Sequence, residues 1–145
     1  MADTLTLDVV TPERQVVHET VSEVQLPGRD GYLGILPMHT PLLTEIGIGS
    51  LSYKQGGATR YVAVNGGFAE VLPDRVTVLA EAAERAEEID VPRAQKALAE
   101  AEKKLAAGAS DPNTDWESLQ QAIRRATVRL EVAQHAGAAA ANSHA

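Results

Sequence analysis

The sequence contains no cysteine, which excludes disulfides, thiolate metal sites and a thiol nucleophile. Aromatic residues make up only 3% of its 145 residues, so a hydrophobic core must be built from Val, Leu, Ile and Ala. No apolar run approaches the roughly 20 residues of a membrane-spanning helix, and the N-terminus, MADTLTLDVV, lacks the basic and apolar regions of a signal peptide. We therefore expect a soluble protein of the cytoplasm.

Positive charge is also scarce, because the formal net charge is −7 at pH 7. Nucleic acids and anionic membrane surfaces attract basic proteins, so neither is an expected partner. The hydrophobic content of 44% is high enough for a real core. The length allows one domain of ordinary size, or a small domain with an appendage.

Short aliphatic segments separated by turn residues dominate the chain before Glu81. The first one has the alternation of a half-buried strand, because Leu5, Leu7 and Val9 are separated by polar residues. We expect strands at 5–9, 16–17, 24–26, 35–36, 46–53, 59–64, 68–72 and 76–80, with turns at 56–57, 65–67 and 73–74. Many short strands at this spacing are typical of a sandwich or a barrel.

Alanine and charged residues replace the strand formers after Glu81. Asp90 followed by Pro92 is typical of a helix start, and the segment 108–113, GASDPN, is typical of a helix end. A capping box at 114–117, TDWE, predicts that a second helix starts at Thr114. Apolar residues recur at steps of three and four in both segments: Val91, Ala94, Leu98, Ala101 and Leu105, then Trp116, Leu119, Ile123, Ala126, Leu130 and Ala133. Two such helices joined by a short loop predict an antiparallel hairpin.

The predicted fold is therefore of the α+β class, with an N-terminal antiparallel β-sandwich at 1–84 and a C-terminal two-helix antiparallel hairpin at 85–135. Residues 136–145 have no pattern and are expected to be disordered. The apolar seams of the hairpin are mostly Ala and Leu. At ~25 cal/mol per Å² of buried apolar area, such contacts barely offset the entropy of ordering the chain. We expect a hairpin that is marginal by itself and able to exchange packing partners.

No spacing in the sequence indicates a catalytic site. The four histidines are far apart, and P-loop, nucleophile-elbow and zinc-helix motifs are absent. Gly28, Gly31 and Gly34 lead into strands, so turn glycines are favoured over a phosphate cradle. His39 lies between two prolines and is either a partly buried turn residue that hydrogen-bonds backbone or an interface contact.

Two groups of charged residues leave alternatives open. The acidic group near the start of the predicted hairpin is typical of a solvated linker, and it would hold a metal only if its members converge. Its members are Glu84, Glu87, Glu88 and Asp90. The basic group is Arg124, Arg125 and Arg129, of which the last two share a helix face. These arginines either pair with glutamates of the partner helix or bind a phosphate chain or an acidic partner segment.

Three motifs occur in order before the second predicted helix: LPGRDGYLGILPMHTPLLT, VNGGFAEVLPDRVTVLAE and AERAEEIDVPRA. With these motifs, residues 4–134 resemble the ε-subunit family of bacterial F-type ATP synthases. The resemblance implies a non-catalytic subunit whose sandwich binds the γ subunit of the central stalk and touches the ring of c subunits. It also implies a mobile hairpin, which lies against the sandwich or extends along γ and blocks rotation in the hydrolytic direction. The implied location is the cytoplasmic face of the bacterial inner membrane, as a peripheral protein held there through the complex.

The resemblance also matches particular residues to roles. Those matched to the γ and c-ring interface are Gly31, Tyr32, Leu33 and His39. Those matched to an inhibitory contact with the catalytic α/β subunits, chiefly with an acidic segment of β, are Arg124, Arg125 and Arg129. No catalytic residue, metal or required cofactor is implied.

Some members of the family bind ATP as a regulatory ligand when the hairpin is folded down, through an I/L-D-x-x-R-A motif that this chain matches. The residues on matching positions are Glu84, Ile89, Asp90, Arg93, Ala94, Arg125 and Arg129. Asp90 and Arg93 are expected to serve the adenine edge and the ribose or phosphate, and the paired arginines to hold phosphate oxygens. Glu100 stands where these members carry a further arginine. A carboxylate there repels phosphate, which predicts weak or absent ATP binding.

Overall fold

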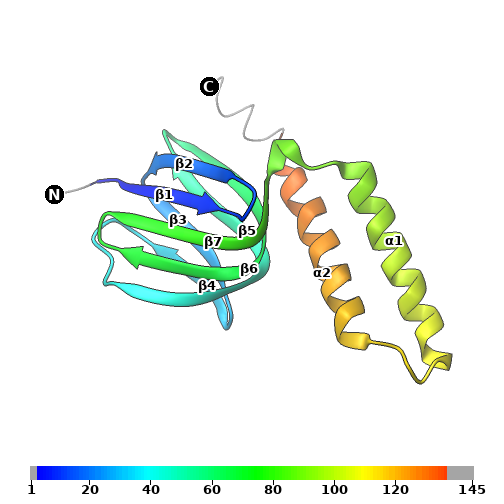
Figure 1. Cartoon of the computed structure of the whole chain (residues 1–145). Helices are drawn as coiled ribbons and strands as arrows, with labels where there is room; N and C mark the ends of the chain where they lie inside the picture. Colours follow the sequence, from blue (N-terminus) through cyan, green and yellow to red (C-terminus); the bar gives the residue numbers. More distant parts are fainter. Residues whose placement is uncertain (1–2, 137–145) are drawn as a thin grey trace.

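The computed structural model describes residues 3–136, which form a β-sandwich with a helical hairpin packed against one end of it (Figure 1). The predicted architecture is confirmed. Among these described residues, seven strands come first, and two helices and two short 3-10 turns follow. The bounds are β1 Leu5–Val10, β2 Gln15–Val21, β3 Glu23–Gly28, β4 Gly31–Ile35, β5 Leu42–Gln55, β6 Ala58–Leu72, β7 Arg75–Arg85, η1 Ala86–Glu88, α1 Val91–Ala107, η2 Gly108–Ser110 and α2 Trp116–Ala133.

The strands follow the order β2-β1-β7-β6-β5-β3-β4. Neighbouring strands are antiparallel except β1 and β7, which are parallel. The core between the layers is aliphatic, as the composition predicts: Leu7, Leu26, Leu51 and Val62 are fully buried, whereas the single phenylalanine of the chain is exposed. None of the helices within residues 3–136 is long and apolar enough to cross a membrane.

The predicted turn at Asn65-Gly66-Gly67 is wrong, because β6 continues through it as one strand. Gly66 and Gly67 have φ values of 63° and 132°, which side chains rarely permit. At this point the strand changes the face that it buries, from Val62 and Val64 before the glycines to Ala69 and Val71 after them. A Cβ on Gly67 would lie 2.0 Å from the carbonyl oxygen of Leu79 on β7. The glycines therefore allow a bend and a close approach of two strands, and not a chain reversal.

The helix starts are set by aspartate side chains. Asp90 Oδ1 accepts a hydrogen bond from the Arg93 N–H at 3.1 Å, which confirms the predicted N-cap of α1. The predicted capping box of α2 at 114–117 is wrong, since the N-cap is Asp115, whose Oδ1 accepts from the Ser118 N–H. Thr114 instead donates its hydroxyl hydrogen bond within the connecting loop, where the carbonyl oxygens of Gly108 and Asp111 lie at 3.0 and 2.8 Å.

Helix α2 lies between the sandwich and α1 (Figure 1). Val128 and Val132 are its most deeply buried large side chains, and they form a second apolar cluster with Ala63, Ala86 and Ile89. The stripe predicted for this helix omits both valines, because it follows a single face. α2 has to cover two neighbours, so it needs apolar residues on a second face as well.

The C-terminal segment predicted to be disordered lies almost entirely outside the residues that the structure describes. Of the predicted disordered segment 136–145, only Ala136 belongs to the described residues, and 137–145 lie outside them. The segment before α1, predicted to be an acidic linker, contains the end of β7 and the 3-10 turn η1.

Candidate functional site

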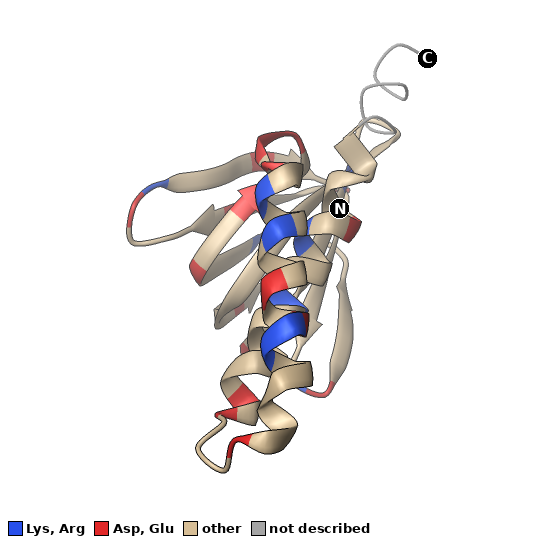
Figure 2. Ribbon diagram, turned by 90° about the vertical axis from the view of Figure 1, so that its right-hand side faces the viewer, with Lys and Arg blue, Asp and Glu red and all other residues tan. Residues whose placement is uncertain are grey.

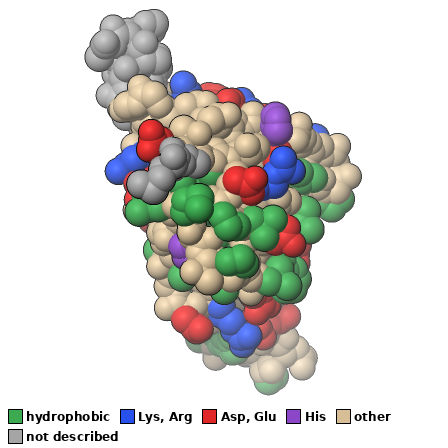
Figure 3. Space-filling model, turned by 90° about the vertical axis from the view of Figure 1, so that its left-hand side faces the viewer, with side chains coloured by type: hydrophobic (Ala, Val, Ile, Leu, Met, Phe, Trp, Pro, Cys, Tyr) green, Lys and Arg blue, Asp and Glu red, His purple; other side chains and the backbone are tan. Residues whose placement is uncertain are grey.

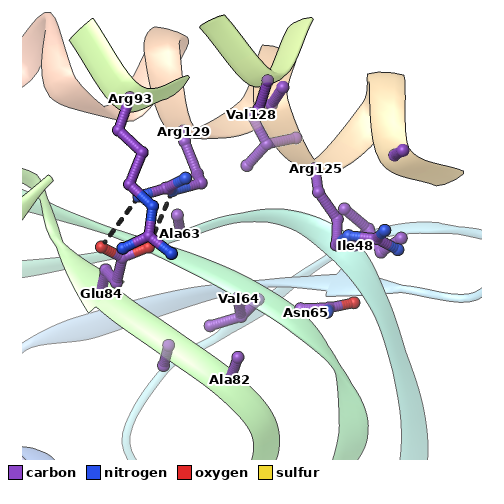
Figure 4. Close-up of a pocket in the computed structure, with 14 residues that line it drawn as sticks. Ile48, Ala63, Val64, Asn65, Ala82, Glu84, Arg93, Arg125, Val128 and Arg129 are labelled. Atoms are coloured by element: carbon purple, nitrogen blue, oxygen red, sulfur yellow. Dashed lines mark hydrogen bonds and ion pairs between the residues drawn. The ribbon is translucent and has the colours of Figure 1, made fainter. Parts of the chain in front are cut away.

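A cavity of about 390 Å³ lies between the hairpin and the sheet, at the middle of β5 and β6 and near the end of β7 (Figure 4). Its walls are mostly small apolar side chains, which leave space because alanines face alanines across the gap. The polar side chains that line it are Asn65, Glu84, Arg93, Arg125 and Arg129. A concave site with apolar walls and a few convergent polar groups is the usual form of a small-molecule site.

Each charged side chain reaches the cavity because of its place on a regular element. Arg93 lies in the first turn of α1. Arg125 and Arg129 are one turn apart on α2, so the prediction that they share a face agrees with their common lining of the cavity. Glu84 lies on β7 opposite Ala63 of β6, on the side of the sheet that faces the hairpin.

Glu84 and Arg129 form an ion pair across the interface. Arg129 Nη2 donates a hydrogen bond to Glu84 Oε2 at 3.3 Å. Arg129 Nε is buried and lies 2.8 Å from Glu84 Oε1, at an angle that is not that of a hydrogen bond, so this second contact is purely ionic. The prediction that the arginines pair with glutamates of the partner helix is wrong for Arg129, because its partner is on the sandwich. Arg93 and Arg125 have no ion-pair partner among residues 3–136.

The cavity therefore carries an excess of positive charge. Three guanidinium groups face one carboxylate, and two of the three are not neutralised within the described chain. Guanidinium groups bind phosphate and carboxylate oxygens through paired N–H donors. The arrangement can hold an anionic ligand that also has an apolar part.

The structure brings together four of the seven residues matched to an ATP site: Glu84, Arg93, Arg125 and Arg129. The other three do not line the cavity. Ile89 belongs to the apolar cluster between α2 and the sandwich, Asp90 caps α1, and Ala94 is fully buried. Glu100 is exposed and is not part of the lining either.

Asn65 is the polar lining residue that the sequence pattern did not predict. The sequence pattern assigned it to a turn, whereas it lies within β6, opposite Ile48 of β5 and Ala82 of β7. The strand alternation could have found it, because Asn65 shares the side of β6 that Ala63 presents to the hairpin.

The residues matched to a γ and c-ring interface fall at two places, the first half of β4 and the β4–β5 loop. Gly31, with a φ of 136°, and the exposed Tyr32 begin β4 directly after the β3–β4 turn, and the half-buried Leu33 packs against the core. His39 is half-buried in the β4–β5 loop, where its Nδ1 lies 2.6 Å from the carbonyl oxygen of Thr40. This backbone contact is compatible with both alternatives left open for the histidine.

Exposed hydrophobic side chains gather at the end of the sandwich farthest from the hairpin (Figure 3). Leu36, Met38 and Leu43 are 57%, 64% and 72% exposed. The Met38 N–H donates to the carbonyl oxygen of Pro73 at 2.7 Å, which holds the β4–β5 loop beside the β6–β7 turn. A cluster of this kind is typical of a surface that another molecule covers.

The residues of the predicted acidic linker make separate contacts with different partners. Glu88 Oε2 lies 2.9 Å from Arg14 Nη2, and Glu88 Oε1 accepts a hydrogen bond from the Arg85 N–H. Partial burial works to raise the pKa of Glu88, but the hydrogen bonds and charges of Arg14 and Arg85 outweigh it, so the pKa lies below its ordinary value of 4.5. No three His, Asp or Glu side chains converge as metal ligands within residues 3–136.

The remaining arginine of the basic group, Arg124, is exposed and does not line the cavity. The outer surface of the hairpin carries both signs of charge, with acidic residues between two groups of basic residues along α1 and acidic residues near the tip (Figure 2). Of the basic group in the folded-down hairpin, Arg124 is therefore exposed to solvent, and Arg125 and Arg129 line the cavity.

Two family models together match nearly the whole chain. Residues 4–86 match the family described as the beta-sandwich domain of the ATP synthase Delta/Epsilon chain. Residues 87–134 match the family described as the long alpha-helix domain of the same chain.

Similar proteins are named ATP synthase epsilon chains. An ATP synthase epsilon chain of Koribacter versatilis is 54% identical over 144 residues, which cover 99% of this chain and 100% of the relative. One of Syntrophobacter fumaroxidans is 46% identical over 92% of this chain and 98% of its own length. Among solved structures, a chain of the Euglena gracilis mitochondrial ATP synthase has a TM-score of 0.66 at 24% identity, covering 97% of this chain and 83% of that one, which supports the fold alone.

Proposed function

Because this chain belongs to the family of ATP synthase delta/epsilon chains, we propose that it is a subunit of the central stalk of a proton-translocating ATP synthase. An epsilon chain is a subunit of that complex and not its catalytic subunit. The observation that carries the proposal is the match of both parts of the chain, sandwich and hairpin, together with 54% identity to an epsilon chain over its whole length. The location that follows is the cytoplasmic face of the bacterial inner membrane, held there through the complex.

The proposed role of the sandwich is to couple rotation of γ to the c ring. The exposed apolar residues far from the hairpin, such as Leu36, Met38 and Leu43, support it, because they need a partner that covers them. The exposed Tyr32 at the β3–β4 turn offers a second contact point. The two contact regions allow one sandwich to touch two partners, γ and the c ring.

The proposed role of the hairpin is to inhibit ATP hydrolysis when it leaves the sandwich and extends toward the catalytic α/β subunits. Its interface supports reversible docking, because small side chains and a cavity lie between the helices and the sheet. The linker suggests where motion starts. Arg14 and Arg85 hold Glu88 on the sandwich, so the hairpin is expected to swing about Ile89 and Asp90.

The inhibitory role is tested by reconstituting the ATP synthase without this subunit, with the wild-type chain, and with Arg124→Gln. We expect the wild type to lower ATP hydrolysis and Arg124→Gln to restore part of it. Arg124 is exposed and outside the cavity, so the change leaves the folded-down contacts intact. Lys103→Gln, which removes an exposed cation of α1, is the matched control. Equal hydrolysis with and without the chain would remove the inhibitory role, and proton pumping per ATP would still test coupling.

A second candidate function is ATP sensing by the folded-down hairpin. The convergence of Arg93, Arg125 and Arg129 on one cavity, with Glu84 beside them, favours it. ATP at ~100 times its dissociation constant would stabilise the docked hairpin by ~2.7 kcal/mol, which is enough to hold a marginal interface closed. Because Glu100 is not in the lining, it weakens binding only through its charge at a distance.

ATP binding is tested by titrating the full chain with MgATP and following backbone amide shifts by NMR. We expect saturable shifts at Arg93, Arg125 and Arg129, and their loss in an Arg93→Ala, Arg125→Ala double variant. Lys96→Ala, an exposed cation of the same helix that does not line the cavity, is the control. Binding that survives the double variant would contradict this site.

A further inference from the structure

We propose that a peroxide oxidises the thioether of Met38 to a sulfoxide, and that this modification weakens the docking of the sandwich on γ. The proposal rests on the coupling function given above, with γ as the partner that covers the apolar end of the sandwich. The sequence contains two methionines, Met1 and Met38, of which Met38 lies within residues 3–136. Met38 is 64% exposed, so an oxidant reaches its sulfur in the free subunit before assembly.

The backbone of Met38 has a conformation that suits another type of residue. The His39 N–H donates to the carbonyl oxygen of Leu36 at 3.2 Å, which closes a turn with Pro37 second and Met38 third. Met38 has a φ of 70°, whereas the other residues with a positive φ within residues 3–136 are glycines. A turn of this pattern favours glycine or asparagine at its third residue, because a Cβ is strained there. The methionine therefore destabilises its own turn, which points to a role for its side chain in binding.

The surroundings of Met38 are those of a contact surface. The Met38 N–H donates to the carbonyl oxygen of Pro73 at 2.7 Å, so the β4–β5 loop is held against the β6–β7 turn. Exposed leucines come from the same segments: Leu36 from the loop, Leu43 from the start of β5 and Leu72 from the end of β6 (Figure 3). An apolar surface drawn from several segments is broad enough for a protein partner, and an unbranched thioether adapts to the shape of that partner.

Oxidation changes the polarity of this contact. The sulfur attacks one oxygen of the peroxide, an S–O bond forms as the O–O bond breaks, and water is released, or an alcohol from an organic peroxide. The electron pair that the sulfur gives up reduces the peroxide, so no further reactant is needed. The S=O group of the product accepts hydrogen bonds from water. An apolar partner surface offers no donor in exchange, so docking strips this water without replacement and the affinity falls.

The test treats the full chain with hydrogen peroxide, removes the peroxide, and measures binding to a catalytic head that contains γ but lacks this subunit and the c ring. Mass spectrometry of the peptide that contains Met38 reports the sulfoxide. We expect oxidation to weaken binding of the wild type about tenfold, the effect of burying one unpartnered polar group. A methionine sulfoxide reductase should restore the affinity, because it regenerates the thioether.

Three variants separate the chemistry of the sulfur from other effects of the oxidant. Met38→Leu keeps an apolar side chain of similar size, so it should bind like the wild type and resist peroxide, although it retains Met1 and Trp116. Met38→Gln places a polar group near the position of the S=O oxygen, so it should bind about tenfold more weakly without any peroxide. Met38→Gly removes the strain of the turn, so it should not lower the free energy of unfolding, yet it should weaken binding.

The outcomes distinguish this inference from the coupling function. If the untreated wild type does not bind the head that contains γ, the coupling function and the inference are both overturned. If it binds, but complete oxidation of Met38 leaves its affinity unchanged, the coupling function stands and the role of Met38 is refuted. If Met38→Leu loses as much affinity on oxidation as the wild type does, the sensitive group lies elsewhere in the chain, which also refutes the role of Met38.

Discussion

Removing the Glu84 carboxylate should weaken the docking of α2 on the sandwich. The Glu84–Arg129 pair is the one ion pair between a hairpin helix and the sandwich within residues 3–136. The side chains of Glu84 and Arg129 are 34% and 21% exposed, respectively. The pair is therefore intermediate between a surface pair, which contributes about 0.2–1 kcal/mol, and a fully buried pair, whose breakage costs about 3–5 kcal/mol. We expect Glu84→Gln to weaken docking by about 1–2 kcal/mol, because the buried Nε of Arg129 loses the carboxylate that lies 2.8 Å from it.

Native-state hydrogen exchange measures this effect where it acts. A loss of about 1.4 kcal/mol lowers the protection of α2 amides about tenfold. The amides of Val128 and Val132 should show it, whereas those of the sandwich core should keep their protection. Glu81→Gln, on the same strand and exposed, is the control. A cycle with Arg129→Gln should be strongly non-additive. Unchanged protection of α2 in Glu84→Gln would refute the assignment of this pair as a docking contact.

Three further predictions concern stability. Val132→Ala should weaken hairpin docking by about 1.5–2.5 kcal/mol, because the side chain is fully buried, and hydrogen exchange in α2 checks it. Gly67→Ala should lower the free energy of unfolding, measured by denaturant titration, by more than about 3 kcal/mol. The φ of 132° and the 2.0 Å approach of a carbonyl oxygen both oppose a Cβ at this position. Gly34→Ala, the control, should be nearly neutral because the space around Gly34 is open. The depressed pKa of Glu88 gives stability that is present above its ordinary value of 4.5 and lost as the pH falls through the folded-state pKa, so Glu88→Gln should flatten the acid limb of the stability profile.

Much of the fold follows from local patterns. The alternation of Leu5, Leu7 and Val9 predicts β1, and Asp90 followed by Pro92 predicts the start of α1. The errors occur where a local signal has two physical meanings. Asn-Gly-Gly reads as a turn, yet Gly66 and Gly67 serve a bend within one strand. Thr114 and Asp115 are both good N-caps, and the loop hydrogen bonds of Thr114 decide between them.

The candidate site could be predicted only in part. The helical spacing of Arg125 and Arg129 puts both on one face, because that spacing is a property of the helix itself. Their partners could not be predicted in the same way. Arg129 meets a carboxylate on β7 that is 45 residues earlier in the chain, and helical periodicity carries no information about that distance.

The sequence by itself determined the class of the fold, the aliphatic core, the two helices and the family, since each depends on spacings within one segment or on motifs in fixed order. The tertiary structure alone decided that α2 buries Val128 and Val132 against the sheet, that Glu84 pairs with Arg129, and that Asn65 lines the cavity. These contacts join segments whose relative position depends on strand register and on how the hairpin docks. Register and docking are set by the sum of many long-range contacts, so no single stretch of the chain encodes them.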